Sequence, residues 1–154
     1  QATVDLVDIS PQALELAWEN ITRHGLEDRV HTIKSDLFKF VDKNRYDIII
    51  SNPPYVSSGE MQELPKEYQH EPALGLEAGS DGLDIVIPLL RLAPSYLKPD
   101  GIIVVEVGLS AEALQQRYPQ VPFLWLDFDR GGDGVFMLTA GQLAQYQLIF
   151  SKDG

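Results

Sequence analysis

The chain has 154 residues, of which 44% are hydrophobic, and this size and composition are typical of one compact domain with a hydrophobic core. Cysteine is absent, which excludes disulfides, thiolate nucleophiles and cysteine-based zinc sites, and the 3 histidines lack the spacing of metal ligands, so no metal site is expected. The 23 acidic residues outnumber the 12 basic ones; this balance disfavours a surface that follows nucleic-acid phosphates and favours a basic protein partner, although solubility alone explains many carboxylates equally well.

Strand-like and helix-like stretches alternate along the chain, which is typical of an α/β fold with a mainly parallel sheet and helices on both faces. Residues 4–9 predict the first strand and residues 29–34 the second. Between them, Ser10 can cap a helix that has Pro11 in its first turn and ends at Gly25. The inward stripe of this helix is predicted to consist of Ala13, Leu14, Ala17, Trp18 and Ile21.

The middle of the chain predicts a strand, a long loop, a helix and a further strand. Residues 46–51 are apolar without alternation, as expected for a strand that is covered on both faces. A long loop then leads to residues 82–97, whose periodicity is helical, but Pro88 and Pro94 predict a kink or an early end. Residues 101–107 predict the fourth strand.

The last third of the chain predicts an antiparallel ending to the sheet. Residues 110–118 predict a short helix and residues 123–129 a fifth strand. The glycine-rich link 131–134 is too short for a crossover helix, so the strand at 135–139 should form an antiparallel hairpin with the fifth strand. Residues 142–154 predict a short helix and a loose tail.

A reactive loop follows the apolar strand 46–51 directly, in the run Asn52-Pro53-Pro54-Tyr55. Neither proline can donate an N–H, and the residue before each proline is held extended, so the loop presents carbonyl oxygens and the Asn side chain in a stiff arrangement. Such acceptors suit an NH2 group with a delocalised lone pair, because binding its two hydrogens turns the lone pair toward an electrophile. The alternative is a rigid turn without chemistry, since Asn-Pro and Pro-Pro are common in loops.

Open parallel sheets bind ligands beyond the carboxyl ends of their strands, which is where Asp8, Asp36 and Asn52 fall. The Asp8 carboxylate can accept both hydroxyls of a ribose. Asp36 can bind the exocyclic amine of adenine, with the neighbouring Leu37 and Phe38 as walls for the ring. As alternatives, Asp8 helps to cap the helix that follows and Asp36 caps a turn.

Together these motifs resemble those of class I S-adenosylmethionine-dependent methyltransferases, in particular the family that methylates glutamine side chains of protein synthesis factors. The family's second-strand motif is similar to residues 7–14, its third to residues 35–38 and its reaction motif to residues 52–55. The loop 64–72 and the ending 125–136 look most like the branch that methylates a glutamine of large-subunit ribosomal protein L-three, rather than the branch that methylates release factors.

The resemblance implies an enzyme with S-adenosylmethionine as cofactor that methylates the side-chain nitrogen of a protein glutamine. The side-chain oxygen of Asn52 and the carbonyl of Pro53 would accept the two amide hydrogens. The implied catalytic residues are Asn52, Pro53 and Tyr55. The implied substrate-binding residues are Asn52, Pro53, Pro54, Tyr55, Glu71 and Pro72. The implied cofactor-binding residues are Asp8, Ile9, Asp36, Leu37 and Asn52.

Two other classes of function share part of this evidence. An amino-adenine nucleic-acid methyltransferase uses the same Asn-Pro-Pro-Tyr motif, but it should carry clustered Lys and Arg, and no basic stripe is evident in the chain. A noncatalytic interaction module could bind a basic protein through its acidic surface. We expect a basic protein substrate, no direct nucleic-acid partner and no membrane contact. A cytoplasmic location is expected because the sequence has no membrane-length apolar run and no signal-peptide pattern.

The start of the chain differs from the family pattern. The family's first strand, its Gly-rich cofactor loop and its N-terminal substrate domain have no counterpart in the sequence. We therefore expect residues 1–154 to form one partial methyltransferase domain that binds cofactor weakly or not at all and is inactive alone. Apolar surface next to the absent strand predicts self-association.

Overall fold

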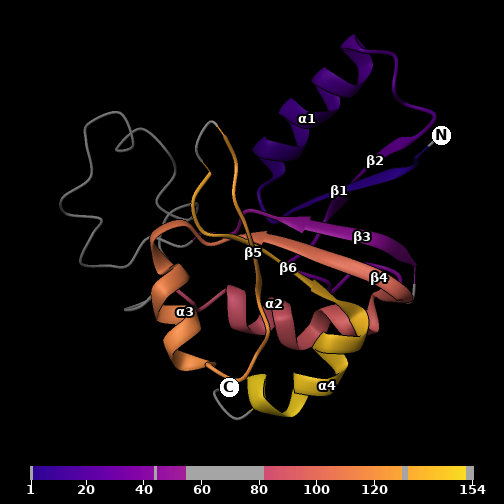
Figure 1. Cartoon of the computed structure of the whole chain (residues 1–154). Helices are drawn as coiled ribbons and strands as arrows, with labels where there is room; N and C mark the ends of the chain where they lie inside the picture. The colour runs from indigo at the N-terminus through magenta and orange to yellow at the C-terminus, as the bar shows by residue number, and fades with distance from the viewer. Residues whose placement is uncertain (1, 44, 55–81, 130–131, 152–154) are drawn as a thin grey trace. The chain divides into compact units, whose positions relative to one another are not determined.

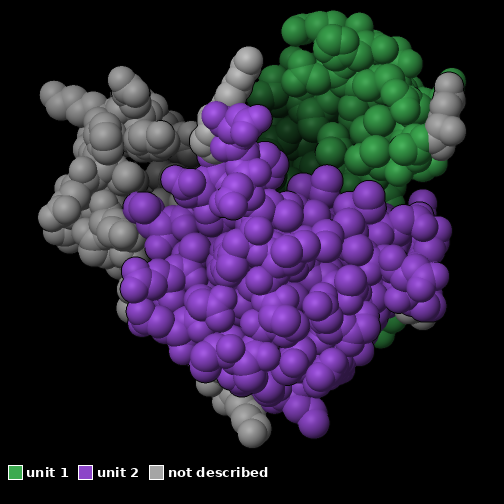
Figure 2. Space-filling view, viewed as in Figure 1, with its two compact units in different colours: residues 1–43 green, residues 44–154 purple. Residues whose placement is uncertain are grey.

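The structure is a computed structural model and describes residues 2–43, 45–54, 82–129 and 132–151. Figure 2 shows two compact units, unit 1 with residues 1–43 in green and unit 2 with residues 44–154 in purple. Each unit contains its own hydrogen-bonded sheet. The single partial domain expected for residues 1–154 stays a prediction.

Unit 1 consists of two parallel strands and the helix that connects them. Strand β1 (Val4–Asp8) pairs with β2 (Val30–Lys34), and α1 (Pro11–Arg23) follows β1 (Figure 1). The hydroxyl of Ser10 accepts a hydrogen bond from the Ala13 N–H at 3.3 Å, so Ser10 caps the helix as predicted. The sequence therefore located all three elements of this unit to within about a residue or two, which is the usual uncertainty of element ends.

The predicted inward stripe of α1 is only partly correct. Ile21 is buried, and Leu14 and Ala17 are half-buried, whereas Ala13 and Trp18 are exposed, Trp18 to 48%. Two strands lie only about 4.8 Å apart, while a helix with its side chains is about 10 Å wide. The sheet of unit 1 is therefore too narrow to cover the whole apolar face of its helix.

Unit 2 contains a four-stranded mixed sheet in the order β3-β4-β6-β5. Strand β3 (Tyr46–Ser51) runs parallel to β4 (Leu97–Glu106). Strand β6 (Val135–Thr139) lies antiparallel to both β4 and β5 (Leu124–Leu126). The antiparallel hairpin predicted from the glycine-rich link is confirmed, whereas β4 begins earlier and β5 is shorter than the sequence indicated.

The helical segment expected over residues 82–97 ends early, as its prolines predicted. Helix α2 (Val86–Leu92) gives way to a 3-10 turn, η4 (Ala93–Ser95), that contains Pro94. Pro88 lies in the first turn of α2, the part of a helix where proline is best tolerated. Only the second of the two prolines therefore interrupts the helix.

Two further helices lie in the described part of unit 2. Helix α3 (Ala111–Arg117) follows a 3-10 turn, η5 (Gly108–Ser110), and confirms the predicted short helix. Helix α4 (Ala140–Phe150) begins earlier than predicted, because Thr139 and Gln142 form a reciprocal capping box at its N-terminus. The ring of Tyr118, just after α3, meets that of Phe150 edge-on at 5.1 Å.

Within unit 2, the described helices α2, α3 and α4 lie on the same side of the sheet (Figure 1). The strands contribute fully buried side chains to this core: Ile103, Val105, Phe136 and Leu138. In contrast, Ile48 is 54% and Ile50 78% exposed. The prediction that the strand at residues 46–51 is covered on both faces is therefore not met within this unit, and a strip of apolar sheet surface is exposed there.

Two glycines bring the backbone after β4 into contact with the start of β6. The Val107 N–H donates to the Gly134 carbonyl at 2.8 Å, and Gly134 has a φ of +75°. A Cβ at residue 134 would collide with the backbone oxygen of Gly108 and would lie 2.8 Å from its Cα. Only glycine fits this position, because both the conformation and the close approach exclude a side chain.

Replacing Gly134 with Ala should lower the free energy of unfolding by about 2 kcal/mol or more, since the backbone must move to admit the Cβ. Urea denaturation followed by circular dichroism measures this change. The matched control is Gly141→Ala in α4, where the nearest atom to the added Cβ lies at 3.9 Å. It should leave stability unchanged or raise it by up to about 1 kcal/mol. Equal stability of the two variants would contradict the role of Gly134.

Candidate active site

Unit 1 brings two of the predicted site residues to one sheet edge. Asp8 is the last residue of β1 and is paired with Lys34, the last residue of β2. The Ser35 N–H donates to the Asp8 carbonyl at 3.0 Å, and Asp36 follows immediately. The side chains of Asp8 and Asp36 are both exposed. Because the strands are parallel, both carboxylates lie at the carboxyl edge, where such sheets bind ligands.

Asp8 has a local structural role in addition to any role in ligand binding. Its Oδ1 accepts a hydrogen bond from the Ser10 N–H at 2.7 Å, just before α1 begins. This bond supports the alternative that Asp8 helps to form the helix start. Oδ2 makes no hydrogen bond with the residues described in the structure. A carboxylate has acceptor sites on both oxygens, so one side chain can fill both roles.

The turn after β2 is held by Ser35 and not by the Asp36 side chain. The Ser35 hydroxyl accepts a hydrogen bond from the Phe40 N–H at 3.0 Å, and Ser35 is only 3% exposed. The Lys39 N–H donates to the backbone oxygen of Asp36 at 3.2 Å. Among the described residues, none hydrogen-bonds the Asp36 carboxylate. The side chain that caps this turn is therefore Ser35 and not Asp36.

The apolar neighbours of the two carboxylates differ in exposure. Leu37 is half-buried and has a φ of +48°, a conformation that is uncommon for a residue with a side chain. Ile9, next to Asp8, is 49% exposed. Phe38 is only 8% exposed and belongs to the core. Leu37 and Ile9 are thus available to a ligand, whereas the predicted wall role of Phe38 is not supported.

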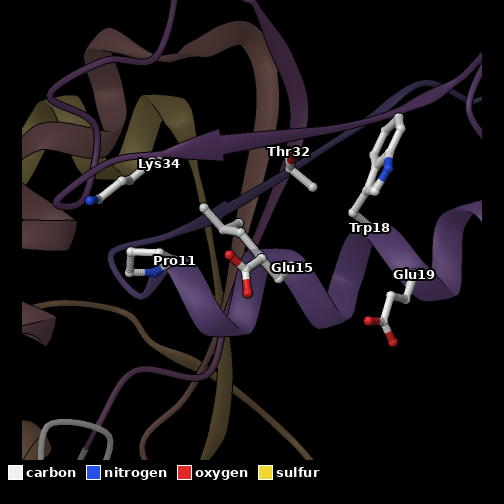
Figure 3. A pocket seen from close by; sticks show the side chains of 7 residues that line it. Pro11, Glu15, Trp18, Glu19, Thr32 and Lys34 are labelled. Carbon is white, nitrogen blue, oxygen red and sulfur yellow. The ribbon is translucent and has the colours of Figure 1, made fainter.

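A separate groove of about 500 Å³ lies between α1 and β2 (Figure 3). Its walls are formed by Pro11, Leu14, Glu15, Trp18, Glu19, Thr32 and Lys34. In Figure 3, Pro11 and Lys34 lie at one end and Trp18 at the other. Asp8 and Asp36 are not among its walls, so it is distinct from the carboxylate edge described above.

Unit 2 holds a hollow of about 370 Å³ at the carboxyl end of β3. It is lined by Ile50, Ser51, Asn52, Val104, Glu106, Phe128, Gly132 and Val135. The side chain of Asn52 is exposed, while Pro53 is buried and Pro54 half-buried. The Asn52 side chain is therefore accessible from this hollow, and the proline that follows is anchored in the protein.

The register of the sheet explains why these residues meet. Ser51 on β3 is level with Val105 on β4, so Asn52 and Glu106 occupy the next position on each chain. Glu106 is in turn paired with Val135 on β6. Side chains alternate between the faces of a strand, so paired positions share a face. Asn52, Glu106 and Val135 thus form a continuous band across the end of the sheet.

Sequence reasoning did not identify Glu106 or Phe128 as site residues. Glu106 ends the apolar run 101–107, and a single carboxylate in such a run was the available signal. Among the described residues, Glu106 has no side-chain hydrogen bond or ion pair. Phe128 is 53% exposed and reaches the hollow only through the pairing of β5 with β6, which no local pattern reveals.

Several predicted features lie outside what the structure describes. Tyr55, Glu71 and Pro72, like the long loop, fall within residues 55–81. The proximity of Asn52 to the carboxylates of unit 1 joins two units and stays a prediction. The described residues contain no group of three or more His, Asp or Glu side chains that could hold a metal ion.

Comparisons with known proteins identify the relatives of this chain. Residues 1–68 match the family model of the methyltransferase small domain. The chain is 47% identical over 151 residues to the ribosomal protein uL3 glutamine methyltransferase of Francisella tularensis, covering 98% of this chain and 48% of the relative. The corresponding protein of Bradyrhizobium diazoefficiens is 46% identical, over 92% of this chain and 44% of that relative. This chain is a homologue of the uL3 glutamine methyltransferases. It spans about half the length of these relatives.

Solved structures agree with the fold expected for such a homologue. The ribosomal protein L11 methylase of Lactobacillus delbrueckii has a TM-score of 0.57 at 19% identity, over 89% of this chain and 57% of that one. A methyltransferase from Pyrococcus furiosus has a TM-score of 0.59 at 18% identity, over 90% of this chain and 62% of that one. The chain has a class I methyltransferase fold, and the family resemblance read from its motifs is confirmed. In the described part of the chain, no helix is long and apolar enough to cross a bilayer.

Two substitutions test whether Ser35, and not Asp36, stabilises the turn after β2. Ser35→Ala should lower the free energy of unfolding by about 1–3 kcal/mol, because it leaves the Phe40 N–H without its partner in a buried turn. Asp36→Ala should change it by less than about 0.5 kcal/mol, since this exposed side chain makes no described hydrogen bond. Urea denaturation measures both. A larger loss for Asp36→Ala would show that Asp36 is a structural residue.

Proposed function

We propose that this protein transfers a methyl group from S-adenosylmethionine to the side-chain nitrogen of a glutamine in another protein, and that ribosomal protein uL3 is this substrate. The observation that most directly supports the proposal is the end of β3, where the exposed Asn52 side chain lines an open hollow and is followed by two prolines. The relatives named above, at 47% and 46% identity, support the choice of substrate.

The loop after β3 offers hydrogen-bond acceptors to the substrate amide. Pro53 and Pro54 have no N–H, so the backbone there cannot compete with the substrate for the acceptors. The side-chain oxygen of Asn52 and the carbonyl of Pro53 would bind the two amide hydrogens and fix the orientation of the nitrogen. Burial of Pro53 supports this role, because an anchored loop holds its acceptors in one geometry. Tyr55 is proposed to pack on the amide plane, and Glu71 and Pro72 to shape the glutamine pocket.

The carboxyl edge of unit 1 has the chemistry required for a nucleoside. The Asp8 oxygen that is not used by Ser10 would accept ribose hydroxyls, and the Asp36 carboxylate would accept the amine of adenine. Ile9 and Leu37 offer apolar contact beside them. When bound, S-adenosylmethionine supplies a methyl carbon activated by a positively charged sulfur. The protein supplies alignment of the nitrogen with that carbon.

Proton removal does not have to precede the transfer in this proposal. The amide nitrogen forms its bond to the methyl carbon as the bond between that carbon and sulfur breaks. The nitrogen becomes acidic only when alkylated, and it then releases one proton to solvent. Asn52 and Pro53 therefore act by orientation, and no general base is assigned to the loop.

The charge of the protein fits a basic substrate. The formal net charge is −11, and a carboxylate, Glu106, lines the hollow beside Asn52. Attraction between opposite charges accelerates encounter with a basic protein. The cytoplasm is the proposed compartment, because a ribosomal protein is available there. Direct binding to nucleic acid is not part of the proposal, and neither is membrane contact; self-association of the chain by itself remains proposed on the basis of its exposed apolar strands.

Replacing Asn52 with Ala in the full-length protein should lower kcat by about 100-fold or more, because the amide nitrogen loses one of the acceptors that orient it. The dissociation constant of the cofactor should change much less, by less than about threefold, since the proposed ribose and adenine acceptors, Asp8 and Asp36, are unchanged. Transfer of tritiated methyl to purified uL3 measures the first quantity, and calorimetric titration measures the second. Unchanged turnover would remove Asn52 from the mechanism.

Asp8→Asn separates the structural role of Asp8 from its proposed cofactor role. Asparagine keeps an oxygen for the Ser10 N–H, so the unfolding free energy should change by less than about 1 kcal/mol. It replaces the second acceptor with a donor, so the cofactor should bind about tenfold more weakly. Glu27→Gln removes the same charge from the loop before β2 and serves as the control. Equal cofactor affinity for both variants in the full-length protein would contradict the ribose role.

A further inference from the structure

The hairpin of β5 and β6 places an aromatic ring at the hollow that contains Asn52. Phe128 lines this hollow and is 53% exposed. The other aromatic side chains of the hairpin, Phe123, Trp125 and Phe136, pack edge-on or tilted against one another with ring centroids 4.9–5.7 Å apart. Among the described residues, Phe128 takes part in no such ring contact. Its ring is therefore not needed for the aromatic core of the hairpin.

The ring of Phe128 nevertheless lies close to the backbone of Gly132. Gly132 has a φ of +104°, and a Cβ at that residue would lie 3.1 Å from Cδ2 of Phe128. This distance is tighter than ordinary van der Waals contact, so the ring would have to move by a few tenths of an ångström to admit a methyl group there. The glycine permits the ring to lie close to the backbone, on the wall of the hollow, although half of it faces solvent.

The hollow combines three features that suit a peptide segment. Asn52, the proposed amide-binding residue, lies on one wall and Glu106 offers an acceptor nearby. The remaining walls are mostly apolar, with Ile50, Val104 and Val135 beside the ring of Phe128. Its volume of about 370 Å³ is in the range of small-ligand sites, which suits the side chain of one glutamine with the adjoining main chain.

We propose that Phe128 is a specificity-determining residue that binds the protein substrate, its ring packing against the segment next to the glutamine that Asn52 orients. The inference rests on the function proposed above. It adds a binding residue for the substrate segment beside the glutamine, to which that function assigned no residue. Exposed aromatic residues beside a pocket contribute large contact area at low entropic cost, and they are enriched where proteins bind one another. Phe128 touches the flanking segment and not the reacting amide, so it affects capture of the protein more than the chemical step.

The test compares steady-state methylation of purified uL3 by the full-length protein and its variants. Phe128→Ala should raise the KM for uL3 about tenfold, while kcat and the KM for S-adenosylmethionine change less than about twofold. Phe128→Tyr keeps the ring and should restore the KM to within about twofold, and Phe128→Leu should lie between them. Leu124→Ala is the matched control, because Leu124 is also 53% exposed on the same hairpin but does not line the hollow. It should leave all three constants unchanged.

A stability measurement distinguishes direct contact between Phe128 and the substrate from a general loss of stability. The midpoint temperature of thermal unfolding should be equal for Phe128→Ala and Leu124→Ala. This result would exclude loss of stability as the cause of the higher KM for uL3. An unchanged KM for uL3 in Phe128→Ala, or an increase in the cofactor KM instead, would overturn the role of Phe128 while leaving the proposed function intact. Failure of the wild-type protein to methylate uL3 would overturn both.

Discussion

The parallel pairing of β3 with β4 is the contact on which the candidate site depends. Because Ser51 is level with Val105, the chain leaves both strands at the same edge, with Asn52 beside Glu106. A slip of one residue would turn every side chain of β3 to the opposite face. The apolar run 46–51 alone does not specify this register, since several of its residues are similar in size and character. The register is specified by the full length of β4 and by the buried core on the other face of the sheet.

The contact between Gly108 and Gly134 extends this arrangement to the hairpin. The two backbones approach so closely that a Cβ on residue 134 does not fit, and the Val107 N–H donates to the Gly134 carbonyl. This contact secures the start of β6, which brings β5 and then Phe128 to the edge of the hollow. Glycines that look like a simple turn signal in the sequence are thus required for the position of a side chain in the site.

Unit 1 illustrates how a local hydrogen-bond network can leave ligand groups free. The Ser35 hydroxyl and a backbone carbonyl hold the turn after β2, so the Asp36 carboxylate is not needed for structure. At the end of β1, one oxygen of Asp8 holds the start of α1 and the other has no described partner. Both strand ends are stiff because of neighbouring polar groups, and stiffness of this kind lowers the entropy lost when a ligand binds.

Local chemistry made much of the protein predictable from its sequence. Ser10 and Pro11 mark a helix start and the glycine-rich link marks a hairpin, because each signal acts within a few residues. Asn52 and its prolines mark the end of β3, and the binding role proposed for this loop also comes from local sequence. Only the tertiary structure determined the order of the strands and the exposure of Ile50. It also determined that Asn52, Glu106 and Phe128 line the same hollow. These features depend on contacts between segments that lie far apart along the chain, and no local preference encodes which partner a strand end will meet.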